Sequence, residues 1–192
     1  MLRIKELISN HATGKKALLF FILANLVYIA MLSITIPATM TFSDDLKILD
    51  MLPMGYDAAY VKTLFNALGE EGRNYYLLRQ IPMDMVYPIL FAVSYCLIIV
   101  YFLRKLHKLD SWMFYLCLIP LIAGLADYVE NFGIITLLIS YPDLSPKIIS
   151  ATSIFSVIKS TSTTIFFIAL IIILIALGYS TLVKKKTNVG HG

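Results

Sequence analysis

Charged residues are scarce in this chain. Only 15% of its 192 residues are Asp, Glu, Lys or Arg, and 59% are hydrophobic, whereas an average soluble domain is about 25% charged. So few charges cannot cover a water-exposed surface, which excludes an ordinary soluble domain and indicates an integral membrane protein. The net charge of +4 is modest and comes from short clusters beside the apolar runs. It therefore indicates contact with lipid headgroups and no nucleic-acid partner.

Cysteine and histidine are also rare. Cys96 and Cys117 both lie in apolar runs and form no CxxC motif, which argues against a thiol-redox enzyme and favours buried free thiols. The three histidines, His11, His107 and His191, all lie outside the long apolar runs. The sequence has no HExxH, Cys/His cluster, P-loop or GxGxxG motif. We therefore predict no metal site and no cofactor, and a Ser-His-Asp arrangement is disfavoured.

Long hydrophobic runs are what the chain has instead. Four runs are long enough to cross about 30 Å of hydrocarbon. We expect transmembrane spans at about residues 17–40, 83–103, 112–141 and 148–183. The predicted fold is an all-α membrane protein, a four-transmembrane-helix bundle that forms one domain over residues 1–192.

Residues 41–82 form the one sizeable polar region between the runs, with six acidic and four basic residues. Apolar residues recur there at helical spacing, at Ala58, Val61, Leu64, Phe65 and Leu68. Asp57 is placed to cap this helix and Gly69 to end it, and a second short helix is expected over 70–80. The first loop is thus predicted to be partly helical, either as a lid on the membrane surface or as a passive cap.

Basic residues set the expected topology. They cluster before the first span, in the loop 104–110 and in the tail at 184–186, whereas the first and third loops are not basic. The positive-inside rule then places both termini in the cytoplasm and the first loop outside it. We expect a multi-pass protein of the cell membrane.

Polar side chains interrupt the third span. Asp127, Glu130 and Asn131 are three and four residues apart, so they share one helix face. Glu130 and Lys159 each lie eleven residues from the ends of the turn joining spans three and four, which is roughly 16 Å along each helix. Because these helices are expected to be antiparallel neighbours, we predict an ion pair of Lys159 with Glu130 or Asp127.

Together these residues suggest a polar cavity in the outer half of the bundle, roofed by the first loop. Its expected lining, and our candidates for ligand binding or proton relay, are Asp84, Tyr87, Asp127, Glu130, Asn131 and Lys159. One lysine cannot pair with every acid, and a buried acid without a cation is a workable proton donor. The alternative is that these groups pair only to fix helix packing.

Two motifs resemble a known group of proteins. The pattern D-x-x-Y-P begins at Asp84 and D-x-x-E-N begins at Asp127, with support from the stretch 55–69 and Tyr75. In this combination the chain is similar to an uncharacterised family of small four-span prokaryotic membrane proteins. The resemblance implies the four-span fold over most of the chain and implies no function.

Three functions remain open from the sequence. The first is binding of a lipid or small amphiphile in the outer-leaflet cavity. The second is a non-catalytic accessory subunit whose polar cluster fixes helix packing. The third is a small proton-coupled carrier, although no inverted repeat is visible. The sequence does not decide whether the protein is an enzyme. It also leaves open a homo-oligomer in the bilayer.

Overall fold

Four long apolar helical stretches dominate the computed structural model, which describes residues 2–189. These stretches are Gly14–Met40, Ala58–Lys105, Trp112–Ser140 and Pro146–Val183. Within residues 2–189 every regular element is a helix, turns and loops join the helices, and there is no strand. The predicted all-α, four-span architecture is therefore confirmed, and the chain is a multi-pass membrane protein.

Residues 2–189 form eleven helical elements. In chain order they are α1 (Leu2–His11), α2 (Gly14–Ala30), the π-helix η1 (Met31–Thr35), α3 (Ile36–Met40), the 3₁₀-helix η2 (Leu49–Met51), α4 (Ala58–Tyr75), the π-helix η3 (Tyr76–Gln80), α5 (Ile81–Lys105), the 3₁₀-helix η4 (Trp112–Leu118), α6 (Ile119–Ser140) and α7 (Pro146–Val189).

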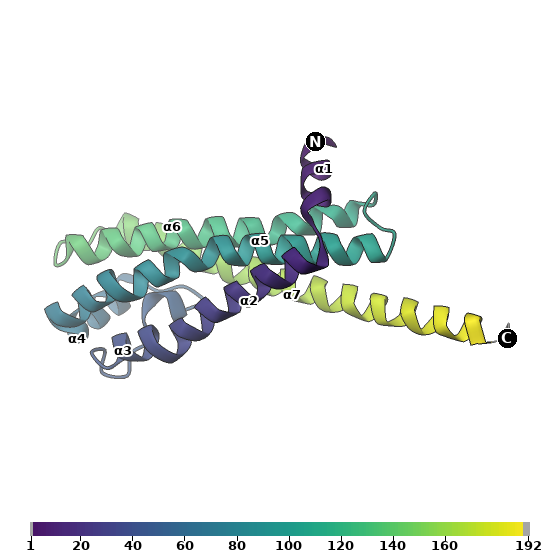
Figure 1. Ribbon diagram of the computed structural model, residues 1–192. Coiled ribbons are helices and arrows are strands. Elements are labelled where there is room, and N and C mark those ends of the chain that lie inside the picture. The colour runs from purple at the N-terminus through teal and green to yellow at the C-terminus, as the bar shows by residue number, and fades with distance from the viewer. Residues whose placement is uncertain (1, 190–192) are drawn as a thin grey trace.

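The long helices pack as an open row. Within residues 2–189, helix α2 packs on α5, α5 on α6 and α6 on α7. Helix α5 also contacts α7, whereas α2 and α7 form no extensive contact. Figure 1 shows α5 and α6 side by side along the bundle and α1 projecting from it, roughly perpendicular to the long helices. We call the end that holds α3 and α4 the α4 end, and the opposite end, near α1, the α1 end. The row is thus open between its first and last helices.

Helix α4 joins the first loop to the second span. The carboxylate of Asp57 accepts a hydrogen bond of 2.8 Å from the backbone N–H of Tyr60, which confirms Asp57 as the helix cap. Gly69 breaks the helix at φ +60° and ψ −170°, a conformation that residues with a Cβ rarely adopt. The helix resumes at Glu70 and continues through η3 into α5. The helical part of the first loop and the second span therefore form one bent stretch.

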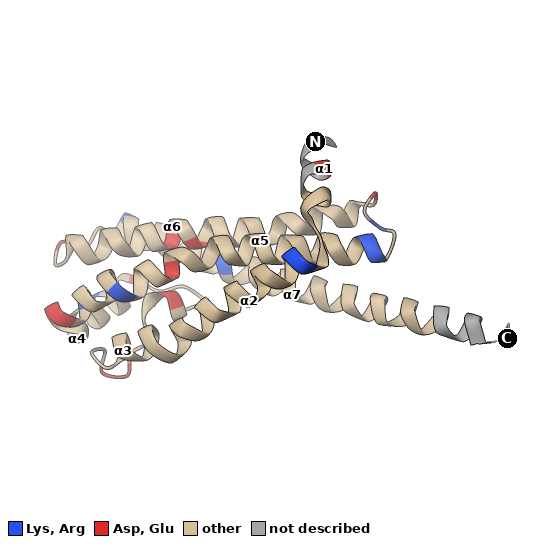
Figure 2. Ribbon diagram, in the orientation of Figure 1, with Lys and Arg blue, Asp and Glu red and all other residues tan. Residues whose placement is uncertain are grey.

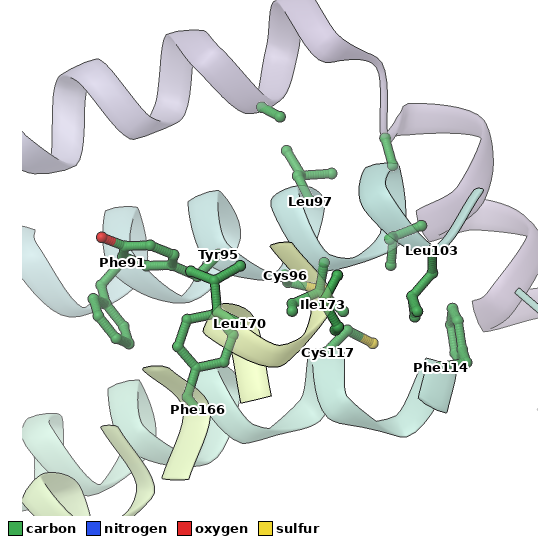
Figure 3. Packing of buried hydrophobic residues seen from close by; sticks show 14 of the residues in the cluster. Phe91, Tyr95, Cys96, Leu97, Leu103, Phe114, Cys117, Phe166, Leu170 and Ile173 are labelled. Carbon is green, nitrogen blue, oxygen red and sulfur yellow. The ribbon is translucent and has the colours of Figure 1, made fainter. Parts of the chain in front are cut away.

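Two apolar cores fill the bundle. The core at the α1 end joins side chains of α5, η4 and α7, and Figure 3 shows Phe91 and Tyr95 facing Phe166 there. The core at the α4 end joins α4, η2 and the end of α6, with Ile48 and Phe65 fully buried. The ring of Tyr87 packs against both cores. The acids buried in the middle of the bundle thus have an apolar core toward each end.

Candidate functional site

An ion triad links α6 to α7. The Nζ atom of Lys159 lies 2.5 Å from Oε2 of Glu130 and 3.2 Å from Oδ1 of Asp127. The predicted ion pair of Lys159 with Glu130 or Asp127 is confirmed, and both acids take part in it. Figure 2 shows acidic positions gathered in the middle of the bundle with a basic position close by. One ammonium group therefore serves two carboxyl groups.

Gly133 allows α6 and α7 to approach each other beside this triad. A Cβ atom placed on Gly133 would overlap the side chain of Thr152 on α7. Gly133 lies one turn beyond Glu130, and Thr152 lies two turns before Lys159, so this close contact brings the two helix backbones together near the triad. The local sequence thus provides both the charges and the small residue that lets them meet.

The triad is buried unevenly. The Glu130 side chain is fully buried, that of Asp127 is 7% exposed and that of Lys159 is 18% exposed. Lys159 pairs with Oε2 of Glu130, and Oε1 of Glu130 has no hydrogen-bond partner. A charge inside a membrane protein is costly unless it is paired or hydrated. The triad therefore holds more acid than its lysine can neutralise.

A cavity of about 390 Å³ lies beside the triad, between the α2 side and the α7 side of the open row. One part of its wall is polar, formed by Asp50, Asp84, Asp127, Lys159, Ser160, Thr163 and Thr164. The other part is apolar or aromatic, formed by Tyr28, Met31, Leu32, Ile36, Met51, Pro53, Tyr87, Phe91, Ala123 and Gly124. The cavity is thus amphipathic, and it lies where the long helices leave the row unclosed.

Four of the six residues proposed from sequence line this cavity: Asp84, Tyr87, Asp127 and Lys159. The other two, Glu130 and Asn131, are fully buried and do not line it. Glu130 reaches the cavity only through Lys159. Neither amide atom of Asn131 has a hydrogen-bond partner. The structure therefore separates the predicted set into a cavity wall and a layer behind it.

Asp84 is more enclosed than its position near the start of a span suggests. The residue is only 3% exposed, and its Oδ2 atom has no hydrogen-bond partner. Nearby on α5, Tyr87 stacks on Tyr28 of α2 with ring centroids 5.4 Å apart and planes at 26°. The first loop and α2 cover this end of α5, so a carboxyl expected at the membrane edge becomes part of the interior.

Asp50 is a cavity residue that sequence reasoning missed. Its carboxylate accepts hydrogen bonds from the hydroxyl of Tyr76 and, at 2.9 Å, from Nε2 of Gln80. The carbonyl of Gln80 in turn accepts from the hydroxyl of Thr35. Asp50 lies in a loop with several acids and has no periodic pattern around it, so nothing local distinguishes it. Only the folding of η2 against η3 brings it to the cavity.

Tyr56 is a second residue that the sequence did not indicate. Its hydroxyl is buried without a hydrogen-bond partner. Burial raises the pKa of this phenol well above its usual range, and the negative charge of Glu130 raises it further. Tyr56 is thus a neutral hydroxyl directed into the protein close to the buried acids.

Three serines of α7 fasten the loop that roofs the cavity. Ser156 donates to the carbonyl of Leu52 at 3.0 Å, and Ser160 donates to that of Pro53 at 2.5 Å. One turn earlier on α7, the hydroxyl of Ser153 accepts a 2.8 Å hydrogen bond from the Tyr56 backbone N–H. The hydroxyl-rich half of α7 therefore holds residues 52–56 in place over the triad.

Comparison with protein-family models, with curated proteins and with solved structures finds no match to this chain. Within residues 2–189, no three His, Cys, Asp or Glu side chains converge in a way that could hold a metal ion. The site must accordingly be interpreted from its own geometry. That geometry combines buried acids, one partly exposed ammonium group and an apolar wall in a single cavity.

Proposed function

We propose that this protein binds a lipid or small amphiphile in the cavity beside Lys159. The observation that supports this most directly is the amphipathic wall of the 390 Å³ cavity. A polar head would lie against Asp84, Asp127 and Lys159, and an apolar tail would lie against Met31, Leu32 and their neighbours. Cavities that are largely apolar with a few convergent polar groups are typical small-molecule sites.

The opening of the helix row supports a bilayer source for this ligand. Helices α2 and α7 provide two sides of the cavity, and within residues 2–189 they make no extensive contact with each other. The roof, by contrast, is held by the three α7 serines and by the buried side chains of Ile48 and Leu49. A molecule dissolved in the membrane can therefore enter between α2 and α7, where fewer side-chain contacts block its way than at the roof.

The proposed orientation places this cavity in the outer leaflet. At the α1 end, helix α5 ends with Arg104 and Lys105 and the turn after it holds Lys108. Basic segments favour the cytoplasmic side. The α4 end, with its acidic loop, would then face outward. Both termini would lie in the cytoplasm, as the charge pattern predicts.

Glu130 and Asn131 have a different role in this proposal. Neither lines the cavity, and Glu130 contacts the Nζ atom that does. We assign Glu130 as a positioning residue that holds Lys159 in the wall. Glu130 and Asn131 then serve helix packing. For these two residues the proposal keeps the structural role that the sequence left open for all six candidates.

The proposal is tested by native mass spectrometry of the full chain with identification of retained lipids. We expect a specific amphiphile to remain bound to the natural chain. The variant Thr163→Trp places a large ring at the cavity wall and should release it. The matched control is Ile168→Trp, which adds the same ring at an exposed position of α7 and should retain the ligand.

Two results would contradict ligand binding. One is a natural chain that retains no amphiphile above the background of bulk lipid. The other is retention of the same amount of the same lipids by Thr163→Trp, Ile168→Trp and the natural chain. Flux driven by a pH gradient in proteoliposomes would instead favour the carrier function, and a stoichiometric protein partner would favour the accessory function.

A further inference from the structure

The polar wall of the cavity has an excess of acid. Asp50, Asp84 and Asp127 line it, and Lys159 is the one cationic side chain among the lining residues. That ammonium group already contacts both Asp127 and the fully buried Glu130. It therefore has little charge left to offer a third carboxyl group or an anionic ligand.

Asp84 is the acid of this wall that has a buried oxygen, Oδ2, without a hydrogen-bond partner. Its carboxyl group is almost fully enclosed, lines the cavity, and has an unpartnered Oδ2 atom. Asp50 differs, because two neutral donors from Tyr76 and Gln80 satisfy its carboxylate. A buried carboxylate without a donor or a counterion is strongly disfavoured. A cation delivered by the ligand would remove that cost, whereas an anionic head would increase it.

Aromatic rings complete the surroundings of this position. Tyr87, one turn from Asp84, stacks on Tyr28, and Phe91 lies 5.7 Å from Tyr87 between ring centroids. All three rings line the same cavity. Aromatic faces attract alkylammonium groups, and the attraction is stronger away from water. Carboxylate and ring faces together therefore suit a cationic head better than a neutral one.

We propose that the amphiphile bound here has a head bearing an ammonium group, which pairs with Asp84 while the tail lies between α2 and α7. This inference rests on the proposed function, because it concerns the same cavity, and it adds the charge of the ligand. The shared chemistry is an ammonium group on an apolar chain. Its source is either a single-chain amine or the amine head of a membrane phospholipid.

The experiment compares three probes of equal chain length on the full chain at one pH, namely dodecylammonium, dodecanol and dodecanoate. We expect dodecylammonium to bind at least about tenfold more tightly than dodecanol, the scale of one charge-assisted hydrogen bond, and dodecanoate to bind most weakly. In Asp84→Asn the ratio of the first two dissociation constants should approach one. The control Asp143→Asn removes an exposed acid from the α6–α7 turn and should retain the preference.

A second arm identifies the source. Native mass spectrometry after reconstitution with equal phosphatidylethanolamine and phosphatidylglycerol shows whether an amine phospholipid is selected. Selective retention of phosphatidylethanolamine, lost in Asp84→Asn, supports the inference with a phospholipid ligand. A dodecylammonium preference without lipid selection supports it with a single-chain amine. The thermal stability of Asp84→Asn is measured in parallel, so that loss of binding is not confused with loss of the fold.

The outcomes separate the two proposals. If dodecanol binds as tightly as dodecylammonium, or if Asp84→Asn keeps the preference, the ammonium inference is wrong while ligand binding stands. If none of the probes binds and no lipid is retained, ligand binding itself is wrong. Tighter binding of dodecanoate than of dodecylammonium would assign the head contact to Lys159 and would also overturn the inference.

Discussion

Lys159 decides the electrostatics of the bundle at the scale of single residues. Its ammonium group is the counterion of both Asp127 and Glu130, so removing it would leave two buried carboxyl groups without a cation. Removing one partner of a buried pair typically costs more than replacing the whole pair by apolar groups. This asymmetry makes the triad accessible to a mutational test.

We predict that Lys159→Met lowers the free energy of unfolding by about 3–5 kcal/mol. Adding Glu130→Gln should restore part of this loss, because the double variant has one uncompensated acid fewer. The measurement is reversible unfolding in mixed detergent micelles. Lys147→Met, at an exposed position of the same helix, serves as the control and should be near neutral. Equal losses from Lys159→Met with and without Glu130→Gln would contradict the shared counterion.

The α6–α7 pair shows what matters at the scale of elements. These helices are joined by the short turn at 141–145, and Gly133 lets them approach beside the triad. We predict that Gly133→Ala lowers the free energy of unfolding by about 1–3 kcal/mol, because its methyl group overlaps Thr152 and forces the helices apart. The same unfolding assay measures it.

The control for this prediction is another glycine of the helical region. A Cβ at Gly178 meets nothing within 4 Å, so Gly178→Ala should be neutral or stabilising by up to about 1 kcal/mol through helix propensity. Adding Thr152→Ala to Gly133→Ala should recover part of the stability, because it removes the two atoms closest to the new methyl group. Equal effects at Gly133 and Gly178 would show that close helix contact is not the cause.

The roof is held to α7 by side-chain hydrogen bonds rather than by a second helix. We predict that the triple variant Ser153→Ala, Ser156→Ala and Ser160→Ala loosens residues 52–56, at about 1 kcal/mol for each lost bond. Amide hydrogen exchange should become faster at Tyr56, whose N–H bonds Ser153, and should be unchanged in α6. The exposed Ser150→Ala is the control. If the amide of Tyr56 exchanges at the same rate in the triple variant as in the natural chain, the serines do not hold residues 52–56 in place.

Orientation belongs to the scale of the whole molecule. We predict that a cysteine at Lys108 reacts with a membrane-impermeant thiol reagent only from the cytoplasmic side, and a cysteine at Met54 only from the outside. Both positions are exposed at opposite ends of the bundle, and Cys96 and Cys117 are first replaced because they are free thiols. Labelling of Met54→Cys from the cytoplasm would reverse the proposed orientation and move the cavity to the inner leaflet.

The sequence was most informative where a repeating pattern had one structural solution. Four apolar runs required four membrane-length helices, Asp57 required a cap, and the equal distances of Glu130 and Lys159 from their turn placed them at one depth. It was least informative for Asp50 and Tyr56. Both lie in the loop between the first two spans, where no helical period indicates which side chains turn inward.

The sequence by itself determined the all-helical fold, the four spans and the pairing of Lys159 with acids of α6. Each of these follows from local periodicity or from a short turn, and so from forces acting between near neighbours in the chain. Only the tertiary structure decided which polar residues face the cavity. That choice depends on α2 and α7 remaining apart and on three serines holding the roof, and these contacts join segments about a hundred residues apart in the chain.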